Sequence, residues 1–270
     1  MDDEFPLCRF CSGNDLKVWV DQYYRCNDCL FVSAVPAPTT EELDQHYCGY
    51  HEKNHQASAL KNDQRALSYA QEISWLADKL DFSGIGQIYD YGASGGYFLD
   101  AFRNALAPST ELYGFDASPG AVEQLRDKGY YKELINLQEG EAGLVTLRGV
   151  LEHLLDFRGI VHDLCRGVRS GGYLFITATP DSSSTVANRY RREWTQHHYP
   201  SHFQHFNTNL VDILMGENGL VPHGTIDLYE SSVYRNDTDN AHWLSHCQGT
   251  MEGINHAYWG SMMTRLYRKT

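Results

Sequence analysis

Between residues 87 and 177 the sequence alternates short apolar segments with helix-like segments, and this alternation constrains the fold more than any other feature. Strands are predicted at 87–91, 112–115, 134–137, 144–147 and 173–177, and helices at 97–105, 118–129 and 159–168. Parallel neighbours in a sheet need long crossover connections, which are usually helical and right-handed. The pattern therefore predicts an α/β fold with a doubly wound, mostly parallel sheet. Two later strands, one before residue 230 and one at 264–268, would make the sheet seven-stranded.

Size and charge narrow the function classes. The 270 residues include 22 Lys and Arg against 35 Asp and Glu, a net charge of −13, and 42% of them are hydrophobic. An acidic chain is a poor match for a phosphate backbone, so no nucleic-acid partner is expected. No apolar run approaches the ~20 residues that span a bilayer, and the acidic residues 2–4 do not resemble a signal peptide. We expect a cytoplasmic protein without membrane contact.

Four of the seven cysteines form two C-x-x-C pairs, Cys8 with Cys11 and Cys26 with Cys29. Each pair directs two thiolates toward one point, and two pairs complete a tetrahedral zinc site with Zn–S bonds of about 2.3 Å. Four protein ligands leave no open position, so a zinc ion held here would be structural. Redox-active or inert thiols are the alternative. The spacing predicts a small zinc ribbon over residues 1–38.

The rest of the chain divides into a connection and a main domain. Leucine, isoleucine and alanine recur at helical spacing between residues 57 and 80, which predicts a long amphipathic helix. Residues 39–82 are therefore expected to form a linker and a helical segment that covers the cleft. The main domain would occupy residues 83–270, with inserts at about 180–206 and 230–260.

A glycine-rich turn follows the first strand predicted for the main domain, and an acidic residue follows the second. The turn runs Asp90-Tyr-Gly92-Ala-Ser94-Gly-Gly96, and the acid is Asp116. Ligands of parallel sheets bind beyond the carboxyl ends of the strands, where an acid can accept hydrogen bonds from ribose hydroxyls. The pair indicates an adenosine-containing cofactor. The dinucleotide fingerprint G-x-G-x-x-G is not met, and a turn with a purely structural role is the alternative.

Taken together, the motifs resemble those of the class I S-adenosylmethionine-dependent methyltransferases. The matching segments are 90–99 (D-x-G-x-G-x-G-x-F-L, with Ser94 in place of the middle glycine), 114–119, 150–154, 170–176 and the P-x-H-x-x-x-F element at 200–206. A small-molecule branch of this family also carries an N-terminal C-x-x-C ribbon followed by a tyrosine-rich segment, here around residues 47–50. The resemblance spans residues 8 to about 226, and the conjunction of motifs is far more specific than any one of them.

The resemblance implies a Rossmann-like methyltransferase fold that binds S-adenosylmethionine. In such a site glycines bring the backbone against the cofactor, Asp116 binds the ribose and Asp90 orients the loop, with a plain loop anchor as the alternative for Asp90. The cofactor-binding residues carried over from the family are Asp90, Gly92, Ser94, Gly96, Asp116, Ala117 and Val150. An acid beside the adenine would be Glu139 or Glu141, and the sequence does not choose between them.

Two histidines are the candidates for a catalytic base. Methyl transfer starts from an activated sulfonium, so the protein supplies mainly alignment, together with a base when the acceptor must lose a proton. His153 follows the fourth strand directly, and His202 lies in the P-x-H-x-x-x-F element. Neutral imidazole titrates near physiological pH, which suits that role. Packed, hydrogen-bonded histidines are the alternative for both.

Three functions are consistent with the sequence. The first is methylation of a small molecule, such as a sugar, a nucleotide sugar or a natural-product intermediate. The second is an RNA methyltransferase that uses the ribbon to hold RNA, against which the net charge of −13 counts. The third is a non-catalytic module of a biosynthetic complex that binds zinc and the cofactor. The sequence specifies neither the acceptor atom nor the oligomeric state.

Overall fold

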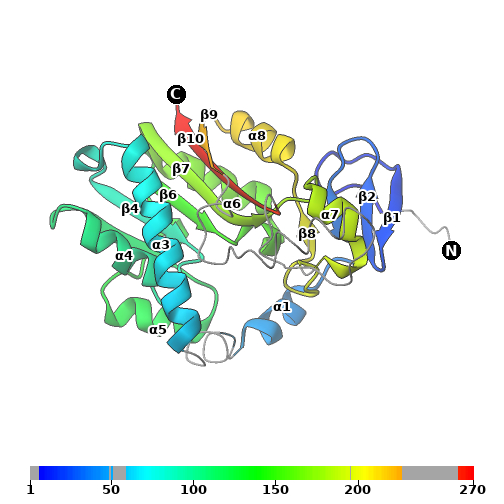
Figure 1. Cartoon of the computed structure of the whole chain (residues 1–270), viewed down its shortest axis with the longest axis horizontal. Coiled ribbons are helices and arrows are strands. Elements are labelled where there is room, and N and C mark those ends of the chain that lie inside the picture. Colours follow the sequence, from blue (N-terminus) through cyan, green and yellow to red (C-terminus); the bar gives the residue numbers. More distant parts are fainter. Residues whose placement is uncertain (1–5, 49, 51–58, 195, 227–260) are drawn as a thin grey trace, which may run out of the picture.

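The computed structural model describes residues 6–48, 50, 59–194, 196–226 and 261–270 (Figure 1). The insert predicted at about 230–260 lies outside these residues. Within them the chain forms a central sheet flanked by helices, with a smaller sheet at the end of the molecule that holds the N-terminus.

The central sheet has six strands in the order β5-β4-β6-β7-β10-β9 within the described residues. Their bounds are β4 Gln87–Tyr91, β5 Glu111–Phe115, β6 Ala142–Arg148, β7 Val168–Pro180, β9 Leu220–Thr225 and β10 Met262–Lys269. The neighbours among β5, β4, β6 and β7 pair in parallel, and β10 runs antiparallel to both β7 and β9. The predicted doubly wound, mostly parallel sheet is confirmed.

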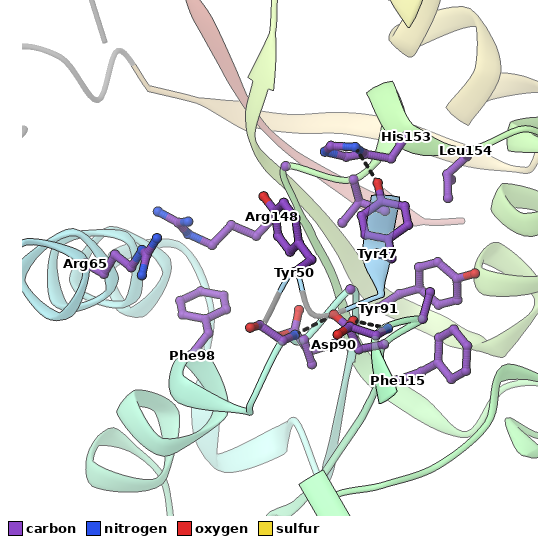
Figure 2. Close-up of a pocket in the computed structure, with 18 of the residues that line it drawn as sticks. Tyr47, Tyr50, Arg65, Asp90, Tyr91, Phe98, Phe115, Arg148, His153 and Leu154 are labelled. Atoms are coloured by element: carbon purple, nitrogen blue, oxygen red, sulfur yellow. Dashed lines mark hydrogen bonds between the residues drawn. The ribbon is translucent and has the colours of Figure 1, made fainter. Parts of the chain in front are cut away.

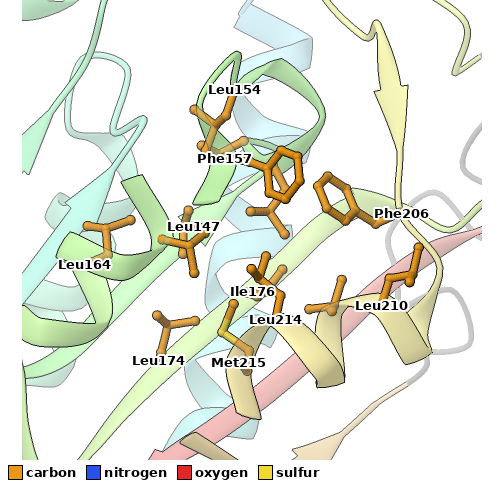
Figure 3. Packing of buried hydrophobic residues seen from close by; sticks show 14 of the residues in the cluster. Leu147, Leu154, Phe157, Leu164, Leu174, Ile176, Phe206, Leu210, Leu214 and Met215 are labelled. Carbon is orange, nitrogen blue, oxygen red and sulfur yellow. The ribbon is translucent and has the colours of Figure 1, made fainter. Parts of the chain in front are cut away.

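Helices cover both faces of this sheet because alternate residues of its strands point to opposite sides. One face packs against α3, α4 and α5, and the other against α6 and α8. The bounds are α3 Ala59–Lys79, α4 Tyr97–Ala105, α5 Pro119–Asp127, α6 Phe157–Gly167 and α8 Thr208–Glu217. On β7, for example, Phe175 faces the first layer, whereas Leu174 and Ile176 face the second (Figure 3).

The strand predicted at 134–137 is wrong. Residues Leu134–Asn136 form a 3-10 turn, and the only pairing of this region with β5 is a parallel bridge between Gly114 and Tyr131. Leu137 instead packs over Gly167 of α6, where a Cβ atom on the glycine would meet the leucine at 2.3 Å. An edge segment has a single neighbour to pair with, and here burial of leucine against a helix prevails over further pairing. The described sheet therefore has six strands where seven were predicted.

The second sheet has four strands, in the order β1-β2-β3-β8. Their bounds are β1 Leu16–Val20, β2 Tyr23–Cys26, β3 Val32–Ala34 and β8 Gln204–His205. Three strands therefore belong to the predicted ribbon, and the fourth comes from a segment about 170 residues further along the chain. β3 and β8 pair antiparallel, with Val32 opposite His205 and Ser33 opposite Gln204.

An aromatic cluster joins the ribbon to the main domain. The rings of Phe10 and Phe31 from the ribbon lie 5.0–6.4 Å from those of Phe157 and Phe206. The Arg9 guanidinium donates to the carbonyl of Leu155, and that of Arg158 donates to the carbonyl of Phe10 at 2.7 Å. The contact is apolar at its centre and hydrogen-bonded at its rim.

Short helices complete the described chain. Helix α1, Thr40–Tyr47, begins with a capping box in which Thr39 and Glu42 exchange hydrogen bonds. The others are α7 Thr185–Tyr190 and the 3-10 turns η1 Phe82–Gly84, η2 Leu134–Asn136, η3 Leu151–His153 and η4 Arg191–Glu193. Among the helices of the described ranges, none has the length and apolar character needed to cross a bilayer.

Candidate active site

A cavity of about 330 Å³ lies at the carboxyl ends of β4, β5 and β6. The turns that follow these three strands line it, and side chains from α1, α3 and α4 add to its walls (Figure 2). This is the edge of an open parallel sheet at which ligands bind, and the volume is that of a small-molecule pocket.

Gly92 sits at the first turn of the cavity in a conformation that favours glycine, with φ of 80°. A Cβ atom at this position would meet Val150 Cγ2 at 2.5 Å. The close approach of the two turns therefore depends on the missing side chain. The backbone beside Gly92 and the Val150 side chain together form the floor of a narrow cradle.

Asp116 connects the turn after β4 to the turn after β5 by hydrogen bonds. Its Oδ2 atom accepts a hydrogen bond from the backbone N–H of Ser94 at 2.8 Å, and its Oδ1 atom accepts one from the N–H of Ser118 at 2.8 Å. Ser94 has φ of 50°, a left-handed conformation, although a serine replaces the glycine usual there. Each carboxylate oxygen can accept further hydrogen bonds, so the group can also receive hydroxyl donors.

Asp90 lies at the end of β4 and is only 2% exposed. Its Oδ1 atom accepts a hydrogen bond from the Thr146 hydroxyl of β6 at 2.5 Å. Burial raises the pKa of Asp90 to about 7, because a charged carboxylate is poorly solvated there. A cation bound in the cavity beside Asp90 would favour the ionised form.

Aromatic rings form much of the remaining wall. Tyr91 and Phe115 stack with ring centroids 5.3 Å apart, and Tyr47 and Tyr50 meet edge to face at 5.6 Å. All four rings line the cavity. Flat apolar walls of this kind suit a planar heterocycle or the faces of a sugar ring. Sequence reasoning did not single out Tyr91 or Phe115, although both adjoin predicted motif residues.

A buried ion pair fixes α3 beside the cavity. The Arg148 guanidinium donates to both carboxylate oxygens of Glu72, at 3.0 and 3.1 Å, and to the Ser68 hydroxyl at 3.2 Å. Glu72 is 1% exposed, and Arg148 lies over the ring of Tyr69 at 4.7 Å. Arg148 and Arg65 also line the cavity (Figure 2). The sequence offered no signal for this pair, because its partners are 76 residues apart.

His153 lines the cavity at the end of η3, opposite the glycine turn (Figure 2). Its Nδ1 atom and the Tyr47 hydroxyl form a hydrogen bond of 2.9 Å. Burial lowers the pKa of His153 to about 4, and the Ser201 carbonyl offsets this only in part. The imidazole is therefore neutral at physiological pH.

His202 lies behind His153 rather than in the wall of the cavity. The two rings meet edge to face with centroids 4.6 Å apart, and His202 Nδ1 is 3.0 Å from the Gln196 carbonyl. Burial lowers the pKa of His202 as well. Its neighbour Gln204 donates to the carbonyls of Leu151 and Leu154, at 2.9 and 2.7 Å, and so holds the turn that carries His153.

The cavity thus brings together most of the residues expected to contact a cofactor. The lining includes Asp90, Gly92, Ser94, Asp116, Ala117, Val150 and His153. Gly96 is not among the described residues that line it, because it begins α4 with φ of 78° and packs against Tyr130 and Leu125. Neither acid expected beside the adenine reaches the cavity. Glu141 pairs with Lys132, and Glu139 pairs with Arg166.

The four ribbon cysteines converge on one point, away from this cavity. Their sulfur atoms all lie within 4.8 Å of one another, and two of the Sγ–Sγ distances, Cys8–Cys29 and Cys11–Cys26, are 3.6 Å. Tetrahedral bonds of about 2.3 Å would place the sulfurs about 3.8 Å apart. The donor set and its spacing therefore fit a zinc ion.

Comparison with known proteins agrees with the fold described above. The family model described as a methyltransferase domain matches residues 58–222. A search of curated proteins finds no match to the sequence.

Solved structures share the fold at low sequence identity. An S-adenosylmethionine-dependent methyltransferase of Thermotoga maritima is 16% identical with a TM-score of 0.54, covering 86% of this chain and 100% of its own. Magnesium protoporphyrin IX methyltransferase of Synechocystis PCC 6803, solved with bound S-adenosylhomocysteine, is 13% identical with a TM-score of 0.52. The match covers 80% of this chain and 90% of the other. A geranyl diphosphate methyltransferase in complex with S-adenosylmethionine is 14% identical with a TM-score of 0.50. The match covers 74% of this chain and 84% of the other.

Proposed function

Because this chain belongs to the class I S-adenosylmethionine-dependent methyltransferases, we propose that it methylates a small polyhydroxylated molecule such as a sugar or a nucleotide sugar. The observation that carries the proposal is the cavity itself. Its floor is the Gly92 cradle, and its opposite wall holds an imidazole, that of His153. The enzyme is expected to work in the cytoplasm, without nucleic acid or membrane.

The residues present fit the methyl donor. Asp116 would accept the ribose hydroxyls, and the stacked rings of Tyr91 and Phe115 offer the adenine a flat surface. Asp90 would face the methionine ammonium, directly or through water. The donor supplies an activated methyl group on a sulfonium, so the protein needs to align the acceptor and exclude water.

The acceptor is inferred from the walls and the charge. Tyrosine rings with polar hydroxyls line the cavity, and rings of this kind suit the faces of a sugar. Two structural neighbours are described as methyltransferases of magnesium protoporphyrin IX and geranyl diphosphate, both small molecules. The net charge of −13 counts against RNA.

His153 and His202 are proposed as the acceptor-side pair. His153 lines the cavity and would take the hydroxyl proton, while His202, packed against its ring, would position it. The four ribbon cysteines are proposed to hold a structural zinc ion. That ion would have no role in the chemistry, because all four of its positions are filled.

Calorimetry on the purified chain tests the donor site. S-adenosylmethionine should bind, NAD should not, and Asp116→Ala should weaken binding by about 1–3 kcal/mol, the range for a lost charge-assisted hydrogen bond. The exposed Asp163→Ala is the matched control. Transfer of a labelled methyl group to a panel of sugars and nucleotide sugars then tests the acceptor. NAD bound in preference, or transfer to RNA alone, would contradict the proposal.

A further inference from the structure

Glu152, His153 and His202 form a second cluster of metal-ligating side chains, and His153 is the member that lines the cavity. We propose that these three residues bind a divalent transition-metal ion, such as Mn²⁺, Fe²⁺ or Zn²⁺, which takes the acceptor oxygen as a further ligand. A donor set of two imidazole nitrogens and one carboxylate binds transition-metal ions more readily than it binds Mg²⁺ or Ca²⁺.

The first support is convergence. One ligand atom from each of the three residues lies within 4.8 Å of the others, and Glu152 Oε1 is 3.9 Å from His153 Nε2. Bonds of about 2.1 Å to one ion place its ligands roughly 3 Å apart. A closure of the order of 1 Å by each side chain would therefore complete the site.

The second support is an unsatisfied carboxylate oxygen. Glu152 is 1% exposed, and its Oε2 atom is buried with no hydrogen-bond partner among the described residues. A buried carboxylate is costly unless it is paired or coordinates a metal. A cation held between Glu152 and the two imidazoles would supply the missing partner.

The third support is the orientation of the imidazoles. The Nδ1 atom of each ring already has a neighbour, the Tyr47 hydroxyl for His153 and the Gln196 carbonyl for His202. Histidines that bind metals generally donate the other ring N–H to such an oxygen, which fixes the tautomer and directs the free nitrogen at the ion. The Nε2 atoms of His153 and His202 are then the proposed ligands, and the ion would replace the contact of the His153 ring with the Ser201 carbonyl.

Three protein ligands leave positions open for substrate, in contrast to the four-sulfur ribbon site. Of the three ligands His153 lines the cavity, so an open position on its side of the ion would receive the acceptor. This part rests on the proposed function and narrows the substrate to molecules with a metal-binding hydroxyl. The hydroxyl oxygen binds the ion and its proton leaves to water. The new O–CH₃ bond then forms as the S–CH₃ bond breaks, giving S-adenosylhomocysteine with no change in the oxidation state of the ion.

The ion and the free imidazole are alternative ways to remove the same proton. With the ion bound, His153 is a ligand and the ion makes the hydroxyl acidic. Without the ion, His153 itself must accept the proton. A chelator that spares the ribbon zinc therefore separates the two, since it lowers turnover only in the first case.

The test is a titration of the zinc-loaded full chain with Mn²⁺ alone. Binding is measured by electron paramagnetic resonance, as the decrease in the signal of free Mn²⁺. We expect one Mn²⁺ per chain. Glu152→Gln and His202→Ala should each weaken binding at least ~10-fold, because even the loss of a supporting residue has that effect. The exposed His162→Ala, outside the cluster, should bind as the wild type does.

Zinc content and S-adenosylmethionine affinity, measured on every variant, show that each one is folded. No saturable Mn²⁺ site in the wild type, or unchanged binding in both folded variants, would overturn the inference. The proposed function would survive that result if the donor still binds and transfer proceeds in a chelator. Mn²⁺ bound by a chain that binds no S-adenosylmethionine would leave the metal site intact and contradict the function.

Discussion

The Tyr47 hydroxyl and the Nδ1 atom of His153 lie 2.9 Å apart, although 106 residues separate them in sequence. The bond links the end of α1 to the turn that follows β6. The short helix after the ribbon therefore contributes directly to the wall where the acceptor is proposed to bind.

Tyr47→Phe should lower turnover while leaving the affinity for S-adenosylmethionine nearly unchanged. The substitution keeps the ring in place but removes the oxygen that orients His153, so the loss falls on the acceptor side. A single hydrogen bond of this kind corresponds to about 1 kcal/mol, or roughly 5-fold in rate. Steady-state kinetics with the acceptor found in the panel, together with calorimetry for the donor, give both quantities. A weakened donor affinity with normal turnover would contradict the assignment.

Gly92→Ala should abolish or strongly weaken cofactor binding and reduce the free energy of unfolding by about 2–4 kcal/mol. The new methyl group would meet Val150 at 2.5 Å, and φ of 80° is unfavourable for alanine. Gly84→Ala is the matched control, because nothing lies within 4 Å of a Cβ atom there. Urea unfolding and calorimetry measure the two effects. Equal behaviour of the two variants would show that the cradle is not required.

Cys26→Ser should release zinc and unfold the ribbon, since metal binding and folding of such a small module are coupled. Cys26 is fully buried among the cluster, whereas Cys48 is exposed and outside it. Cys48→Ser is therefore the control and should keep one structural zinc per chain. Elemental analysis with thiol titration reads the outcome. Four freely titratable ribbon thiols in a folded, zinc-free wild type would disprove the site.

Acidification should weaken the packing between the ribbon and β8, because two buried imidazoles there resist protonation. His197 Nδ1 and His205 Nε2 are 3.1 Å apart. Burial lowers the pKa of His197 to about 4, and it also lowers the pKa of the fully buried His205. The unfolded chain binds these protons near pH 6.5, so the stability they contribute is present above that pH. It is lost as the pH falls toward 4.

The acids Asp90 and Glu152 act in the opposite direction, so the histidine effect must be measured as a difference. Burial raises their pKa values to about 7 and about 8, and their contribution to stability declines as the pH rises from about 4 toward those values. His197→Phe keeps an aromatic ring against Trp19 and Tyr23. Relative to the wild type, its free energy of unfolding should fall less between pH 6.5 and 4. Parallel curves for the two proteins would refute the assignment.

Local signals explain what could be predicted. The C-x-x-C pairs and the glycine turn are short motifs whose geometry is set by adjacent residues, and both lie as expected. Pro119 opens α5 and Gly129, with φ of 72°, follows its end, as proline and glycine do at helix termini. The sheet followed from alternation alone. The failure at 134–137 has the same origin, because an apolar run does not reveal whether its leucines will face a strand or a helix.

The site was less accessible to sequence reasoning because its walls come from distant segments. Nothing near Arg148 indicates that Glu72 will pair with it, and nothing near His202 indicates that its ring will pack on His153. Gly96 is assigned to the cofactor by the motif, and the structure places it at the N-cap of α4, outside the residues that line the cavity. Motif matching indicated the enzyme family, whereas packing determines which of the predicted residues line the cavity.

The pairing of β3 with β8 has a consequence for how the molecule is made. The ribbon emerges from the ribosome first, yet its fourth strand is translated only after most of the central sheet. Until then the rings of Phe10 and Phe31 lack Phe206 to cover them. The ribbon is thus an integral part of the fold, since it shares a sheet and an aromatic cluster with the main domain. A shortened protein without it would expose the other half of the same aromatic cluster and lose the strand that supports Gln204.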